Sequence, residues 1–123
     1  MLDLSSDKSI YIQIAEMIEN HIILGSLKEE DQAPSTNEFA RIYQINPATA
    51  RKGLNLLVDE GILYKKRGLG MFVAEGARQK ILMKRQVSFL ADTLPEVIRE
   101  ANRLEIDIKE LIGHIKELGG EKC

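Results

Sequence analysis

Two helix starts lie close together in the middle of this sequence and limit the folds it can adopt. Ser35 is followed three residues later by Glu38, the spacing of a capping box, in which each side chain accepts a hydrogen bond from the other residue's backbone N–H. Asn46 is followed by Pro47, and asparagine before a first-turn proline is a typical helix start. The sequence therefore predicts two helices, over residues 35–43 and 47–60, joined by a short link.

Apolar spacing predicts which helix faces are buried. Residues three or four apart share one face of a helix, and this spacing also predicts an earlier helix over residues 9–24. Gly25 and Gly61 are expected to end the first and third helices. The positions expected to be buried are Ile10, Ile14, Met17, Ile18 and Ile22 in the first helix, Phe39, Ala40 and Ile42 in the second, and Ala50, Leu54, Leu57 and Val58 in the third.

A basic hairpin is predicted after the third helix. Its strands are expected over residues 62–66 and 71–74, around the turn Arg67-Gly68-Leu69-Gly70. Together these elements predict a mostly α fold with a small β-hairpin wing, a winged helix-turn-helix followed by a helical C-terminal segment. Such a domain most often places its recognition helix in the major groove of DNA and its hairpin on the backbone.

Charge is distributed unevenly along the chain, although the formal net charge is only −2. Residues 41–85 hold ten Lys and Arg against three Asp and Glu, whereas residues 1–40 and 86–123 are both acidic. A basic middle is what phosphate binding needs. The alternative is that these charges only form a solvated surface.

Composition indicates an ordinary globular chain. The hydrophobic fraction is 44%, and no apolar run approaches the roughly 20 residues that cross a bilayer. The N-terminus has neither the basic lead nor the apolar stretch of a signal peptide, and the single cysteine, Cys123, cannot form an internal disulfide. We therefore expect a cytoplasmic protein without a membrane partner.

Catalytic and metal-binding chemistry is not expected. His21 and His114 lie in the first and last predicted helices, and no Cys or carboxylate set has the spacing of metal ligands. The glycines of the hairpin precede a strand rather than a helix, so they do not form a nucleotide-binding motif. The sequence therefore predicts no enzyme, no metal site and no cofactor.

The ordered motifs resemble the amino-terminal DNA-binding domain of the GntR family of bacterial transcription regulators. The resemblance covers little more than half of the chain and implies DNA contacts at Ser35, Thr49, Arg51, Arg67 and Gly68. The matching motifs are Ile10-Tyr11-Ile12-Gln13-Ile14, Pro34-Ser35, Asn46-Pro47-Ala48-Thr49-Ala50-Arg51, Asp59-Glu60-Gly61-Ile62-Leu63 and Arg67-Gly68-Leu69-Gly70-Met71-Phe72-Val73.

Two positions depart from the family pattern. Asn37 stands where the family usually has arginine, so a contact expected there loses charge and reach. Gly53 stands where alanine is usual, and a glycine inside a helix costs about 1 kcal/mol relative to alanine.

The predicted DNA contacts lie at the helix starts and on the hairpin. Arg51 falls within the first two turns after the Asn46-Pro47 cap, where recognition helices meet base edges. The cations beside Gly68 favour phosphate or minor-groove contact, although they could instead only protect the exposed sheet edge. The predicted DNA-binding residues are Ser35, Asn37, Asn46, Thr49, Arg51, Lys52, Lys65, Lys66, Arg67 and Gly68.

Residues 75–123 are predicted to form two or three helices that pair two copies of the chain. They are too few to enclose a ligand pocket with its own core, and a short helical tail resembles the YtrA branch of the family, whose members pair through their tails. Thr93-Leu94-Pro95-Glu96 has capping-box spacing, and Asp107 is the expected cap of a last helix ending near Leu118. The predicted dimer contacts are Met83, Val87, Leu90, Leu94, Val97, Leu104, Ile108, Leu111 and Ile115.

The sequence thus predicts a homodimeric repressor. Residues 1–74 would bind a double-stranded operator with inverted symmetry and residues 75–123 would dimerise, while a small-molecule effector stays unknown. One alternative is that the apolar stripes pack on the winged domain of a monomer. Two alternative functions are a winged-helix module for an acidic protein partner and a ligand sensor with a small effector site between the tails.

Overall fold

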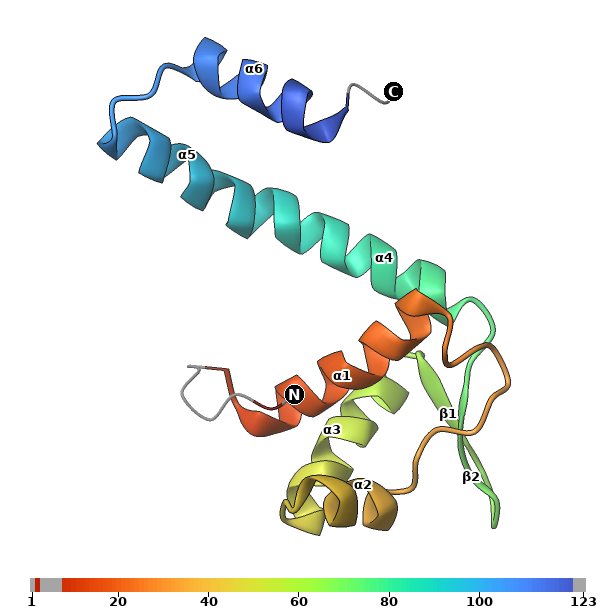
Figure 1. Cartoon of the computed structure of the whole chain (residues 1–123). Helices are drawn as coiled ribbons and strands as arrows, with labels where there is room; N and C mark the ends of the chain where they lie inside the picture. The colour runs from red at the N-terminus through yellow and green to blue at the C-terminus, as the bar shows by residue number, and fades with distance from the viewer. Residues whose placement is uncertain (1, 3–7, 121–123) are drawn as a thin grey trace. The chain divides into compact units, whose positions relative to one another are not determined.

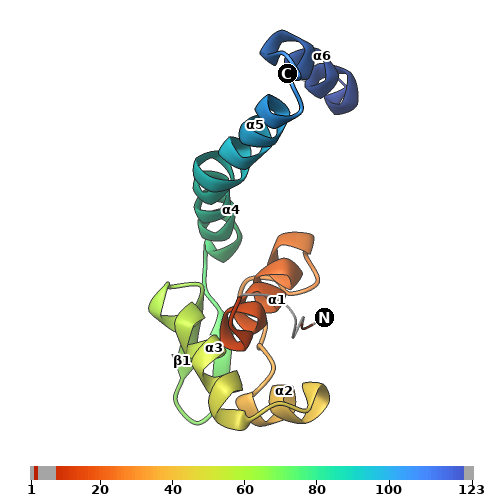
Figure 2. The same cartoon turned by 90° about the vertical axis from the view of Figure 1, so that its left-hand side faces the viewer.

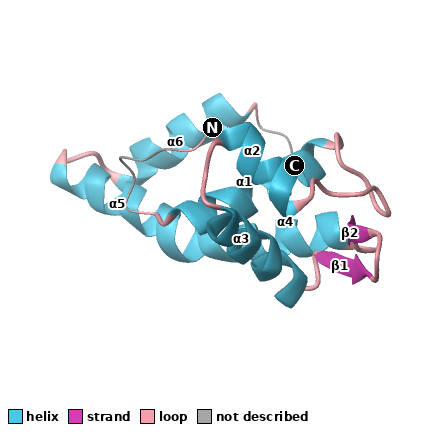
Figure 3. Cartoon of the chain, turned by 90° about the horizontal axis from the view of Figure 1, so that it is seen from below, coloured by secondary structure: helices cyan, strands magenta, loops and turns pink. Residues whose placement is uncertain are grey.

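The computed structural model describes Leu2 and residues 8–120, and the chain divides into two compact units between Met83 and Lys84. The first unit contains three helices, a two-stranded hairpin and the first turns of a fourth helix (Figure 1). Figure 3 shows the two strands side by side, as the only strands among helices in the described part of the chain. These elements are α1 (Ile10–Leu24), α2 (Thr36–Tyr43), α3 (Pro47–Asp59), β1 (Leu63–Lys66), β2 (Gly70–Val73) and α4 (Ala77–Ser88).

The predicted capping residues start α2 and α3. The Ser35 hydroxyl accepts from the Glu38 backbone N–H at 3.0 Å, and the Glu38 carboxylate accepts from the Ser35 N–H at 3.1 Å. The Asn46 Oδ1 accepts from the Ala48 N–H at 2.8 Å. Both helix starts were therefore predicted correctly, because a cap depends on residues adjacent in sequence.

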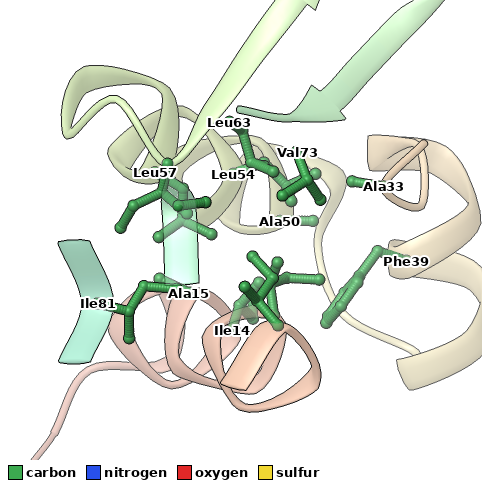
Figure 4. Packing of buried hydrophobic residues seen from close by; sticks show 14 of the residues in the cluster. Ile14, Ala15, Ala33, Phe39, Ala50, Leu54, Leu57, Leu63, Val73 and Ile81 are labelled. Carbon is green, nitrogen blue, oxygen red and sulfur yellow. The ribbon is translucent and has the colours of Figure 1, made fainter. Parts of the chain in front are cut away.

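The core of the first unit lies between α1, α3, the hairpin and the start of α4. Ile14, Leu54 and Val73 are fully buried within it (Figure 4). Ala77 and Ile81 of α4 are also fully buried, so α4 begins as part of this unit. The Arg78 Nε donates to the Ile23 carbonyl at 3.0 Å and the Lys80 Nζ to the Gly61 carbonyl at 3.1 Å, and these bonds hold α4 at the ends of α1 and α3.

The burial predictions were correct at most positions and wrong at Ile42. This side chain is 58% exposed, because it lies two residues after the buried Ala40 and thus points to the opposite side of α2. Ile10, Met17 and Val58 are only partly buried, although all three pack against the core.

Gly53 lies where α1 and α3 pack most closely. A Cβ atom at this position would come 2.7 Å from the Tyr11 carbonyl oxygen and 2.9 Å from Cγ2 of Ile14. Helix propensity alone favours alanine over glycine at this position, but the close packing of α3 on α1 leaves no room for a methyl group.

The wing is an antiparallel hairpin with a three-residue turn. Leu63 pairs with Val73 and Lys66 with Gly70, so Gly70 belongs to β2 rather than to the turn, and Ile62 precedes β1 as a buried residue. The segment 30–33 lies along the outer edge of β2. The Glu30 N–H donates to the Val73 carbonyl at 2.8 Å and the Ala33 N–H to the Met71 carbonyl at 2.9 Å, which gives the wing a third extended segment.

The second unit contains a π-helical turn, η1 (Phe89–Thr93), and the helices α5 (Leu94–Arg103) and α6 (Ile108–Gly119). The prediction that a helix starts with a capping box at Thr93 was wrong, because Thr93 has helical dihedrals and no side-chain cap. Pro95 has no N–H and its ring crowds the preceding turn, and the wider η1 turn just before it, with the Leu94 N–H donating to the Phe89 carbonyl, accommodates both effects. Asp107 caps α6 as predicted, accepting from the Lys109 N–H at 3.2 Å.

Candidate nucleic-acid interface

The start of α3 and the turn of the wing lie at the same end of the first unit (Figures 1 and 2). These two elements carry five exposed cations, which we call the basic surface: Arg51 and Lys52 on α3, and Lys65, Lys66 and Arg67 on the hairpin. α2 contacts α3 in the usual order of a helix-turn-helix, and β1 also contacts α3. The cations of α3 and of the hairpin therefore belong to elements that share one buried core.

Arg51 is the most available cation on α3. Its side chain is exposed and forms no hydrogen bond or ion pair with any residue that the structure describes. The neighbouring Lys52 is held differently, because its Nζ lies 4.2 Å from the centroid of the Tyr11 ring, within the range of a cation–π interaction. Thr49 is half-buried on the flank of the same helix. Of these three side chains, Arg51 is therefore the one that is both exposed and without a partner in the described chain.

An open cleft of about 420 Å³ lies along the exposed face of α3. Arg51, Lys52 and Asn55 line it, together with Tyr11 from α1. The Oδ1 of Asn55 is buried and has no hydrogen-bond partner within the described chain. Because this acceptor is buried, the cations are the charged groups that this face of α3 presents.

The wing carries its cations in two arrangements. The Lys66 Nζ lies 4.4 Å from the centroid of the Phe72 ring and 5.8 Å from that of Tyr64, so its stem covers one face of the hairpin. Lys65 and Arg67 are exposed and have no side-chain partner among the described residues. Gly68 has φ +77°, a left-handed conformation that a side chain would disfavour. A Cβ atom added at this position would meet no other atom within 4 Å.

Ser35 and Asn46 have structural roles in this fold. The oxygen of each side chain accepts a backbone N–H in a helix cap, which leaves its donor group and one oxygen lone pair for another partner. Asn37 is exposed on the first turn of α2, with no charge to offer a phosphate. The structure thus places all ten residues predicted to bind DNA on the helix starts and the wing, and the contacts themselves stay predictions.

The segment before α2 contributes two side chains that sequence reasoning missed. The Tyr64 hydroxyl of β1 donates to the Glu30 carboxylate, and this hydrogen bond, with a smaller effect of burial, raises the pKa of Tyr64 above its ordinary value. The Gln32 Nε2 donates to the Leu69 carbonyl at the wing turn at 2.7 Å. No local pattern signals either bond, because the partners are 34 and 37 positions apart.

A helix-turn-helix followed by a two-stranded hairpin is the architecture of winged helix-turn-helix DNA-binding domains. The family model described as "Bacterial regulatory proteins, gntR family" matches residues 10–73. The chain belongs to this family and is a DNA-binding transcriptional regulator. No helix in the described part of the chain is both long and apolar enough to span a membrane.

Known proteins resemble this chain over most of its length. The transcriptional repressor YtrA of Bacillus subtilis is 29% identical over 120 residues, which cover 98% of this chain and 92% of YtrA. The crystal structure of a GntR-family regulator from Bacteroides thetaiotaomicron superimposes with a TM-score of 0.76 and 34% identity, over 92% of this chain and 98% of that one. The DNA-binding domain of AraR, solved in complex with operator ORR3, is 32% identical over 60% of this chain and 92% of that one, with a TM-score of 0.51.

Proposed function

We propose that this chain is a homodimeric repressor that binds an operator with inverted symmetry and blocks transcription by occupying it in the cytoplasm. In this proposal the winged helix of residues 1–74 binds DNA and residues 75–123 pair two copies, while the first turns of α4 pack against the winged helix. The likeness to a repressor, YtrA, supports the direction of regulation, and the AraR–operator complex supports a DNA-binding role for the matched domain.

The exposed apolar surface of the second unit is the observation that supports dimerisation. Large apolar side chains of η1, α5 and α6 and of the residue that follows α5 are exposed, five of them by between 44% and 64%, and soluble monomers rarely leave such a surface uncovered. A second copy is the simplest cover, because a two-fold axis lets the same surface meet itself. These side chains are Leu90, Val97, Leu104, Ile112 and Ile115.

A two-fold dimer would also explain an inverted repeat as the operator. The axis that relates the two tails would relate the two copies of α3, so each copy would meet an identical half-site in opposite orientation. Half-sites one helical turn or a multiple apart would then match the separation of the two recognition helices.

Charged substitutions in the tail test this proposal. Val97→Glu combined with Ile115→Glu is expected to convert a dimer into a monomer, because pairing would bury four unpaired carboxylates. Sedimentation equilibrium at micromolar concentration measures the oligomeric state, and a filter-binding titration measures operator affinity, expected to fall by at least about tenfold for the inverted repeat but little for a single half-site.

Asn102→Glu is the matched control, since it adds a carboxylate to an exposed polar position of the same α5 helix. The control should remain dimeric. A wild-type chain that is monomeric while bound to the operator, or a doubly substituted chain that still pairs, would contradict the proposed dimer.

A further inference from the structure

The segment between α1 and α2 forms hydrogen bonds with both strands of the wing. Backbone hydrogen bonds join it to β2, where Val73 donates its N–H to the Asp31 carbonyl at 2.9 Å and Gln32 forms an isolated bridge with Phe72. The Glu30 carboxylate accepts from Tyr64, so a side-chain bond reaches across to β1 as well. The same segment leads through Pro34 into the Ser35 cap of α2. It therefore connects the wing directly to the helix-turn-helix.

Gln32 extends these contacts to the turn that contains Arg67 and Gly68. Its Nε2 donates to the carbonyl of Leu69, the last residue of the turn, at 2.7 Å. The fit is close, because a Cβ atom at Gly70 would lie only 2.8 Å from the same Nε2. Glycine at position 70 thus leaves the space that the amide occupies.

The turn closes a short hairpin. The Leu69 N–H donates to the Lys66 carbonyl at 2.9 Å, and each strand of the hairpin has only four residues. Isolated two-stranded hairpins are marginally stable in water. The hydrogen bond from Gln32, which lies outside the hairpin, is therefore expected to contribute strongly to the position of the turn relative to α3.

We propose that Gln32 is a positioning residue for DNA binding: its side-chain amide holds the wing turn, and with it Arg67 and Gly68, at the place where the wing meets DNA. The proposal rests on the DNA-binding role of the wing. Gln32 acts through the turn rather than by touching DNA, and it lowers the cost of ordering the turn when DNA binds.

The test joins a measurement on the free protein to one on the complex. Gln32→Ala is expected to lower the ¹⁵N order parameters of the Gly68 and Leu69 amides from the rigid range, about 0.85, toward about 0.6. Affinity for the selected operator is expected to fall about 3- to 10-fold, the equivalent of one lost net hydrogen bond. Gln79→Ala, which removes an exposed amide of α4 with no partner among the described residues, is the matched control and should change neither quantity.

A double-mutant cycle separates positioning from direct contact. In an Arg67→Ala background, where the turn has lost its cation, Gln32→Ala is expected to have a much smaller effect on affinity. An unchanged order parameter, or an equal loss of affinity in both backgrounds, would overturn the positioning role. If the wild-type chain binds an operator and Gln32→Ala binds it equally well, this inference fails alone; if the wild-type chain selects no operator, the proposed function fails with it.

Discussion

Gly53→Ala is expected to lower the free energy of unfolding by about 2 kcal/mol, although helix propensity alone favours alanine by about 1 kcal/mol. The added Cβ would lie 2.7 Å from the Tyr11 carbonyl oxygen and 3.0 Å from Cβ of Ile14. Both atoms belong to or adjoin the backbone of α1, so they cannot move aside as the end of a flexible side chain could. Overpacking of this kind typically costs about 1–3 kcal/mol, and here it would outweigh the propensity gain.

Gly113→Ala provides the matched control for this prediction. Gly113 also lies inside a helix, α6, but a Cβ there meets nothing within 4 Å. Alanine is therefore expected to stabilise the chain by about 0.5–1 kcal/mol at this position. Urea denaturation at one fixed protein concentration, followed by circular dichroism, measures both variants. A Gly53→Ala chain as stable as the wild type would contradict the close packing of α1 on α3.

Arg51→Ala is expected to weaken binding to the selected operator by about 1–3 kcal/mol, roughly 5- to 150-fold. The Arg51 guanidinium is exposed and unpaired within the described chain, and it follows the Asn46 cap by little more than one turn of α3. A bidentate contact with a guanine would account for a loss of this size. The loss should be accompanied by a relaxed preference at one base pair in each half-site.

Fluorescence anisotropy titrations with the operator and with single-base variants of it measure this effect. Lys66→Ala is the comparison, since a cation on the wing is expected to contact phosphates and its loss should weaken all duplexes about equally. If Arg51→Ala instead weakened binding to the operator and to its variants by the same factor, Arg51 would contact phosphates rather than recognise a base.

Local signals in the sequence were sufficient for the winged helix itself. The Ser35 capping box, the Asn46-Pro47 start and the left-handed Gly25 fix helix ends through neighbouring residues, and the structure confirms each of them. The apolar spacing of α1 and α3 identified the buried side chains for the same reason, because one helical period determines which positions share a face.

Features that depend on distant contacts could not be predicted this way. The requirement for Gly53 comes from α1, and the tie between Gln32 and Leu69 joins positions far apart in sequence. Around Pro95, the local pattern suggested a helix start, whereas the helix continues through the π-helical η1 turn. The same holds for the candidate site. Its cations were identified from the sequence, whereas the hydrogen bonds that link the wing to residues 30–33 depend on distant contacts and were not.

Selection of bound duplexes from a random library at about physiological salt shows whether this chain recognises an operator and whether it does so as a pair. The purified chain is expected to enrich an inverted repeat and to bind it about 10³-fold or more tightly than a scrambled duplex. Enrichment of a single half-site would support recognition by α3 but would contradict the proposal that a dimer binds both halves of an inverted repeat. No enrichment, with only weak and salt-sensitive binding to every duplex, would contradict the proposal that this chain recognises an operator by itself.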